Sequence, residues 1–65
     1  MELEQIEKDV REYIFNRTDI TISEQAERIP VILDLIVSIY NKYTEELTPE
    51  EAYTILYGEQ DEHIH

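Results

Sequence analysis

Carboxylates are the side chains of this 65-residue chain with the most evident chemistry. The segment from Glu45 to His65 holds seven of them and contains no Lys or Arg. A dense acidic surface can occupy a basic groove, including one that binds DNA phosphates, and it speeds association by electrostatic steering. The alternative is that these carboxylates only keep a small protein soluble. The residues in question are Glu45, Glu46, Glu50, Glu51, Glu59, Asp61 and Glu62.

Tyrosines accompany the acidic segment. Tyr53 and Tyr57 are one helical turn apart, and Tyr brings a large contact area to an interface at low entropic cost. We therefore predict a partner-binding surface that faces a protein with a basic surface. Its members are Glu45, Glu46, Glu50, Glu51, Tyr53 and Tyr57.

The C-terminal residues offer metal ligands in a weak pattern. His63 and His65 follow three carboxylates, and such a set could chelate a transition metal. The spacing of a calcium loop is missing, and so are groups that would orient the ligands. We expect no metal or other cofactor, and we interpret residues 59–65 as a flexible acidic tail.

Catalysis has little support in the sequence. The serines and threonines have no His near them in the chain, so no activated nucleophile is indicated. Asp34 lies in an aliphatic segment, but it shares a helical stripe with Ser38 and Asn41. This stripe indicates a polar seam that contacts water or hydrogen bonds, rather than a buried functional carboxylate. We do not expect an enzyme.

The composition excludes several partners. The formal net charge is -11, from 16 acidic and 5 basic residues, which repels nucleic acid and anionic lipid. The apolar stretch from Ile29 to Tyr40 is interrupted by Asp34 and is shorter than the ~20 residues that cross a bilayer. The chain has no Cys, and its start is acidic where a secretory signal is basic, so we expect a cytoplasmic protein.

Three helices are predicted to position these side chains, so the fold class is all-α. Leu3, Ile6, Val10, Tyr13 and Ile14 form one apolar stripe on a helix over residues 2–17. A second helix covers residues 23–46, begins at a capping pattern over 21–24 or with Ser23 as its N-cap, and is broken or kinked near Pro30. A third covers 49–57, from a capping box at 48–51 to a stop at Gly58. Residues 1–58 then form a single helical domain.

The central helix has more apolar surface than one neighbour can cover, since polar residues leave an arc of roughly 240°. The other two helices could cover this arc within a monomer, or part of it could be a dimer seam. A chain of 65 residues buries only ~60% of its unfolded surface, which favours a second chain. We predict a homodimer through Ile32, Leu35, Ile36, Ile39, Tyr40 and Tyr43.

Three functions are compatible with these patterns. We favour a non-catalytic acidic module, an inhibitor or DNA mimic, that occludes a basic surface of a larger protein. The second is a small dimeric regulator, antitoxin-like or DNA-binding: the order of an extended Ile20–Ile22 segment and two helices is similar to that of ribbon-helix-helix dimers. The negative net charge opposes this function. The third is a structural subunit of a larger assembly.

Overall fold

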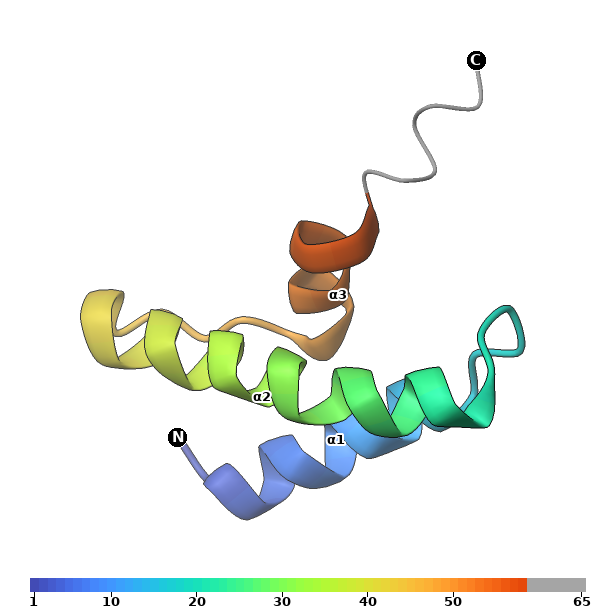
Figure 1. Cartoon of the computed structure of the whole chain (residues 1–65). Coiled ribbons are helices and arrows are strands. Elements are labelled where there is room, and N and C mark those ends of the chain that lie inside the picture. The colour runs from blue at the N-terminus through green and yellow to red at the C-terminus, as the bar shows by residue number, and fades with distance from the viewer. Residues whose placement is uncertain (59–65) are drawn as a thin grey trace.

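The protein is all-helical in the computed structural model, which describes residues 1–58. Its three helices are α1 (Leu3–Phe15), α2 (Ile22–Tyr43) and α3 (Pro49–Tyr57), and this described part contains no strand. In Figure 1, α1 and α2 run in opposite directions as a hairpin, and α3 rises from the other side of α2. The chain returns along α2 between Tyr43 and Pro49, so α3 reaches the middle of the fold (Figure 1).

Two capping boxes fix where α2 and α3 begin, as the sequence predicts. The Thr21 hydroxyl accepts the Glu24 backbone N–H at 3.1 Å, and the Glu24 carboxylate accepts the Thr21 backbone N–H at 2.8 Å. Thr48 and Glu51 repeat both bonds at 3.1 Å. Each box satisfies helix N–H groups that have no partner within the helix. Pro49 occupies the first position of α3, where its missing N–H costs nothing.

The core takes two side chains from each helix. Val10 and Ile14 come from α1, Ile32 and Ile36 from α2, and all four are fully buried. Ala52 and Tyr53 of α3 complete it. The predicted apolar stripe of α1 therefore faces the core, although Leu3 at its end is 49% exposed. The principal dimensions of 35 × 25 × 14 Å leave room for only this one layer of buried side chains.

Pro30 does not break α2, so of the break or kink predicted there the break is wrong. The helix runs continuously from Ile22 to Tyr43 with Pro30 inside it. Pro30 lacks the N–H that would bond to the carbonyl of Ala26, one turn earlier. Both residues are exposed, so water can reach that carbonyl. The cost of the proline is therefore smaller than it would be in a buried helix.

The end of α2 also differs from the prediction. The helix stops at Tyr43, three residues before the predicted Glu46. Thr44 has the left-handed backbone conformation, with φ at 54°, and its N–H donates to the Tyr40 carbonyl at 2.7 Å. This geometry terminates a helix, and it usually requires Gly or Asn.

The end of α3 lies where it was predicted, at Tyr57. Gly58 follows with an ordinary right-handed φ of -66°, so it does not use the conformational freedom of glycine. A Cβ at Gly58 would lie 2.9 Å from Cγ2 of Thr54, so another residue there would require the exposed Thr54 side chain to shift. Within residues 1–58, no helix combines the length and the hydropathy that crossing a membrane requires.

Candidate partner-binding surface

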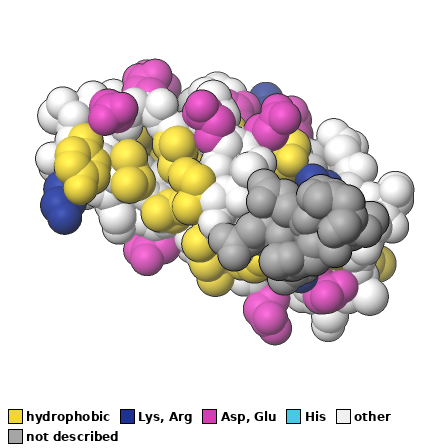
Figure 2. Space-filling view, turned by 90° about the horizontal axis from the view of Figure 1, so that it is seen from above, with side chains coloured by type: hydrophobic (Ala, Val, Ile, Leu, Met, Phe, Trp, Pro, Cys, Tyr) yellow, Lys and Arg dark blue, Asp and Glu magenta, His cyan; other side chains and the backbone are white. Residues whose placement is uncertain are grey.

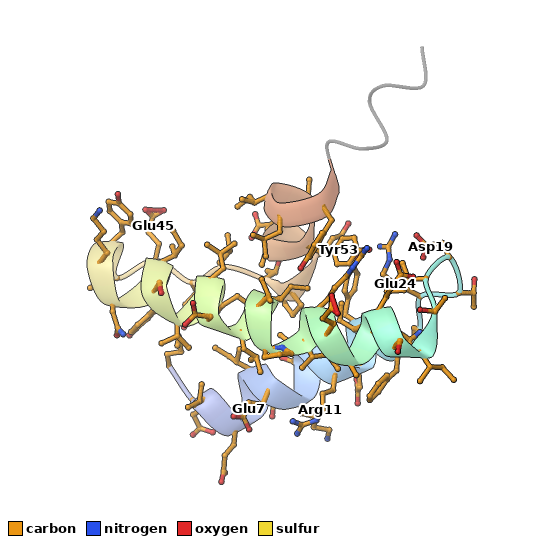
Figure 3. The ribbon with its side chains drawn as sticks, viewed as in Figure 1. Glu7, Arg11, Asp19, Glu24, Glu45 and Tyr53 are labelled. Carbon is orange, nitrogen blue, oxygen red and sulfur yellow. The ribbon has the colours of Figure 1, made fainter. Side chains whose placement is uncertain are left out.

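The structure divides the predicted partner-binding residues into two groups. In Figure 3, Glu45 stands at the far end of α2 from Tyr53, which points toward the end that carries Asp19 and Glu24. Glu46 and Glu50 border two hollows near the start of α3. Tyr53 is only 6% exposed and Tyr57 is partly buried, and both contact arginines. The six residues therefore do not form one continuous surface.

The tyrosines belong to a cluster with two of the five basic residues, which we call the arginine–tyrosine cluster. Cζ of Arg17 lies 4.1 Å from the ring centroid of Tyr53, and Cζ of Arg28 lies 4.4 Å from that of Tyr57. Arg28 also donates to the Tyr53 hydroxyl at 2.7 Å. Tyr13 adds an edge contact to the Tyr53 ring, with centroids 5.8 Å apart, and accepts from Arg17 at 2.9 Å.

Carboxylates already balance these two arginines. Asp19 accepts two hydrogen bonds from the Arg17 guanidinium, at 2.8 and 3.1 Å, and Glu24 lies 3.6 Å from Arg28. The hydrogen bond raises the pKa of Arg17 and lowers the pKa of Asp19, since both charged forms gain a partner. The cluster borders a polar hollow of about 190 Å³, but its charges are matched within the chain. Its contacts join α3 to α2 and to the segment that follows α1.

One hydrogen bond ties this cluster to the loop between α1 and α2. Nε2 of Gln25 donates to the Arg17 backbone carbonyl at 2.8 Å, and Gln25 is the buried polar residue of the described core, 8% exposed. The bond fixes the backbone from which the Arg17 side chain departs. Ile20 in the same loop packs against the core, whereas Ile22 is 81% exposed, so Ile20 anchors this loop.

The first acidic hollow, which we call the α1–loop hollow, lies between the start of α1 and the segment before α3. Its volume is about 340 Å³. Ile6, Leu47 and Pro49 provide apolar lining, and Glu2, Asp9 and Glu46 provide carboxylates. Met1, Gln5 and Thr48 complete the wall.

The second, the α3 hollow, lies along the exposed side of α3 and has a volume of about 350 Å³. Leu47 lines this hollow as well, together with Ile55, which is 54% exposed. Glu50 and Glu51 provide its carboxylates, and Thr54 completes it. Figure 2 shows exposed apolar side chains gathered beside carboxylates on the face that it displays. Glu51 already accepts bonds in its capping box, so Glu50 is the freer of the two carboxylates.

The residues predicted for a dimer seam lie mostly within the fold of one chain. Ile32 and Ile36 are fully buried in its core. Leu35, Ile39 and Tyr40 are partly buried, and Tyr43 is 53% exposed. The apolar surface of α2 is thus partly covered by α1 and α3, and Val31 and Tyr43 remain exposed on it. Dimerisation through α2 stays a prediction.

The predicted polar stripe of α2 is confirmed, because its members are exposed. They are Asp34, Ser38 and Asn41. The residues singled out in the C-terminal tail lie outside the described residues, and they are Glu59, Asp61, Glu62, His63 and His65.

Neither the arginine–tyrosine cluster nor the two acidic hollows could be predicted from the sequence. The basic residues appear scattered along the chain, and Arg17 is separated from Tyr53 by all of α2. Only the tertiary arrangement shows that Arg17 and Arg28 meet on α3. Comparisons with protein-family models, with curated proteins and with solved structures found no match for the chain.

Proposed function

We propose that this protein is a non-catalytic binding module that docks on a basic surface of a larger protein and occludes it. The observation that carries the proposal is the pair of hollows around Leu47, in which apolar side chains lie beside carboxylates. A basic surface that also presents aliphatic groups would bury both kinds of contact there. This combination fits a protein better than it fits a nucleic acid or an anionic lipid.

The distribution of charge supports the proposal. Arg17 and Arg28 are paired with Asp19 and Glu24, so two of the five cations are balanced locally. No Lys or Arg is among the residues that line the α1–loop and α3 hollows. With a net charge of -11, the protein steers a basic partner toward these hollows and raises its association rate at low salt.

The apolar lining of the hollows contributes binding free energy that does not depend on charge. Ile55 is 54% exposed in the α3 hollow, and Leu47 contributes to both hollows. Burying such side chains yields about 25 cal/mol per Å² of apolar surface, and this term persists when salt screens the charges. The affinity of the complex should therefore fall as salt is added. It should fall less than that of a purely ionic complex, because the apolar contacts remain.

A capture experiment tests this function. The tagged chain is incubated with lysate of its native host, eluted in rising salt steps, and each fraction is identified by mass spectrometry. The capture is repeated with Glu45→Lys plus Glu50→Lys, because Glu50 lines the α3 hollow and Glu45 precedes Glu46 of the α1–loop hollow. These changes spare the capping box of Glu51. The control is Glu12→Lys plus Glu27→Lys, because these exposed residues line none of the described hollows and the net charge changes equally.

The expected result is a basic protein that elutes at moderate salt, is lost with the first double variant and is retained by the control. If the captured protein has a nucleic-acid-binding surface, added chain should displace its nucleic acid. If both double variants retain the captured protein equally, the two hollows have no docking role. Release only by denaturant, or capture of no protein, would favour a structural subunit in place of an electrostatic inhibitor.

Homodimerisation is a separate proposal with its own observation. Tyr43 is 53% exposed at the end of α2, next to partly buried Ile39 and Tyr40. Repulsion between two chains of charge -11 opposes self-association, so a dimer should strengthen as salt screens that repulsion. Sedimentation velocity over a range of protein and salt concentrations tests this, with Tyr43→Ala as the disrupting variant. A monomer under all conditions would refute it.

A further inference from the structure

We propose that the α1–loop hollow receives a single Lys or Arg side chain from the protein partner. This inference rests on the proposed function, and it specifies the chemistry of the contact. The hollow has an apolar part, formed by Ile6, Leu47 and Pro49, and three carboxylates, on Glu2, Asp9 and Glu46. A Lys or Arg side chain has the complementary construction, with an aliphatic stem and a cationic head.

The size and the position of the hollow suit such an occupant. Its volume of about 340 Å³ lies at the lower end of the ~300 to 1,000 Å³ typical of ligand sites, so it can hold a Lys or Arg side chain but not a large cofactor. The carboxylates come from both walls, with Glu2 and Asp9 at α1 and Glu46 before α3. A cationic head placed in the hollow therefore meets negative charge from two segments of the chain.

The charges of the lining favour a cation from outside. The lining contains no Lys or Arg, and even with the amino group at Met1 it keeps a net negative charge. Asp9 accepts a hydrogen bond from Nε2 of Gln5 at 2.9 Å, which orients one carboxylate without neutralising it. In the arginine–tyrosine cluster, by contrast, Asp19 and Glu24 already face guanidinium groups of this chain.

Other occupants fit less well. Phosphates of nucleic acids and anionic lipid headgroups would be repelled by the three carboxylates. A second copy of the chain could deliver Lys8 or Arg11, which are exposed on α1, but it would bring a further charge of -11. A neutral apolar side chain would leave the carboxylates without a partner. A basic segment of a different protein is the occupant that the charges favour.

The test uses the full chain labelled with ¹⁵N and a defined probe. The peptide acetyl-Leu-Arg-Leu-amide is titrated while amide chemical shifts are followed, and the same peptide with citrulline in place of arginine serves as the neutral comparison. Amide shifts are expected at Ile6, Asp9 and Leu47. Because an exposed ion pair contributes up to about 1 kcal/mol, the citrulline peptide should bind about fivefold more weakly.

Matched variants locate the site. Asp9→Asn plus Glu46→Gln should weaken the arginine peptide by about fivefold, whereas Glu12→Gln plus Glu27→Gln, with the same change in net charge, should alter it by less than about twofold. The amide spectrum of each variant also reports whether it is folded. No shifts with the peptide, equal binding of the citrulline peptide, or shifts confined to Glu50 and Ile55 would each overturn the proposal.

The capture experiment separates this inference from the proposed function. A host partner that is lost with Glu45→Lys plus Glu50→Lys but retained by Asp9→Asn plus Glu46→Gln would overturn the inference and leave the proposed function standing. A partner insensitive to all of these changes would overturn both. Shifts that grow with protein concentration alone, and disappear with Lys8→Gln plus Arg11→Gln, would assign the hollow to a second copy and overturn the inference as stated.

Discussion

Cζ of the Arg17 guanidinium lies over the ring of Tyr53 in α3, 4.1 Å from the ring centroid. Arg17 follows α1, and Tyr53 lies in the middle of α3, so this contact joins the first and the last helix of the fold. The same arginine bonds to Asp19 and Tyr13. A surface cation thereby closes one end of a core that holds few buried side chains.

Replacing Arg17 should test this fastening directly. Arg17→Ala removes the contact with the Tyr53 ring and the bonds to Asp19 and Tyr13, so we expect a loss of about 1 to 2 kcal/mol in the free energy of unfolding. Arg17→Lys keeps the charge but not the planar fork, and it should give an intermediate loss. Urea denaturation measures both. A change below about 0.5 kcal/mol for Arg17→Ala would show that the cluster is incidental to stability.

The hydroxyl of Tyr53 offers a narrower test. Tyr53→Phe keeps the buried ring but removes the acceptor of the 2.7 Å bond from Arg28, and should cost about 0.5 to 1.5 kcal/mol. Tyr57→Phe is the matched control, since its ring stacks on Arg28 and, within residues 1–58, its hydroxyl makes no side-chain hydrogen bond. Equal losses for the two variants, measured by urea denaturation, would argue against the Arg28 bond as the cause.

The capping carboxylate of Glu24 predicts a pH dependence. Hydrogen bonds from Thr21 lower the pKa of Glu24 below its ordinary value of 4.5. A carboxylate with a depressed pKa in the folded state stabilises the fold fully above the unfolded pKa, and this stabilisation is lost as the pH falls through the folded pKa. The stability difference between the wild type and Glu24→Gln should therefore be constant at neutral pH and shrink below pH 4.5.

Comparison of variants is essential to that measurement, because acid also relieves repulsion in a chain of charge -11 and shifts the stability of every variant. Glu27→Gln, on the same helix and outside the capping box, serves as the control. The difference in the free energy of unfolding between Glu27→Gln and the wild type should not shrink below pH 4.5 as that of Glu24→Gln does. If both differences change in parallel, the effect reflects net charge and not the cap.

Replacing Pro30 should raise the free energy of unfolding, whereas the substitutions above should lower it. Pro30→Ala restores a backbone N–H inside α2, where it can bond to the Ala26 carbonyl, and removes the clash of the proline ring with the preceding turn. The unfolded chain gains some entropy in return, so we expect a net stabilisation of about 1 to 2 kcal/mol. Ser38→Ala, exposed on the same helix, should gain less than about 0.5 kcal/mol. A destabilised Pro30→Ala protein, detected by thermal unfolding, would show that Pro30 has a structural role.

The helices could be predicted because their signals are local. The capping boxes at Thr21 and Thr48 depend on residues three positions apart, and the stripe that contains Val10 and Ile14 repeats with the helical period. The break at Pro30 was predicted wrongly because the free-energy cost of a proline in a helix depends on whether water reaches the carbonyl that it leaves unbonded. That exposure is a property of the packed structure.

The candidate surface was less predictable, because it depends on how distant segments meet. The sequence identifies Glu46 and Glu50 as acidic, but not that Leu47 lies between two hollows. It also places Tyr53 beside carboxylates along the chain, whereas in space the ring faces Arg17. Adjacent residues of an α-helix point to different sides, so closeness in sequence within α3 does not define a shared surface.

The fastening of α3 by side chains from earlier in the chain has a consequence for folding kinetics. Docking of α3 on Arg17 joins segments far apart in the sequence, whereas the α1–α2 hairpin joins neighbouring segments. We therefore expect α3 to dock late, after the transition state. Destabilising substitutions at the buried Ala52 should then accelerate unfolding and leave the folding rate nearly unchanged. The last helix would act as a latch that sets the lifetime of the folded protein.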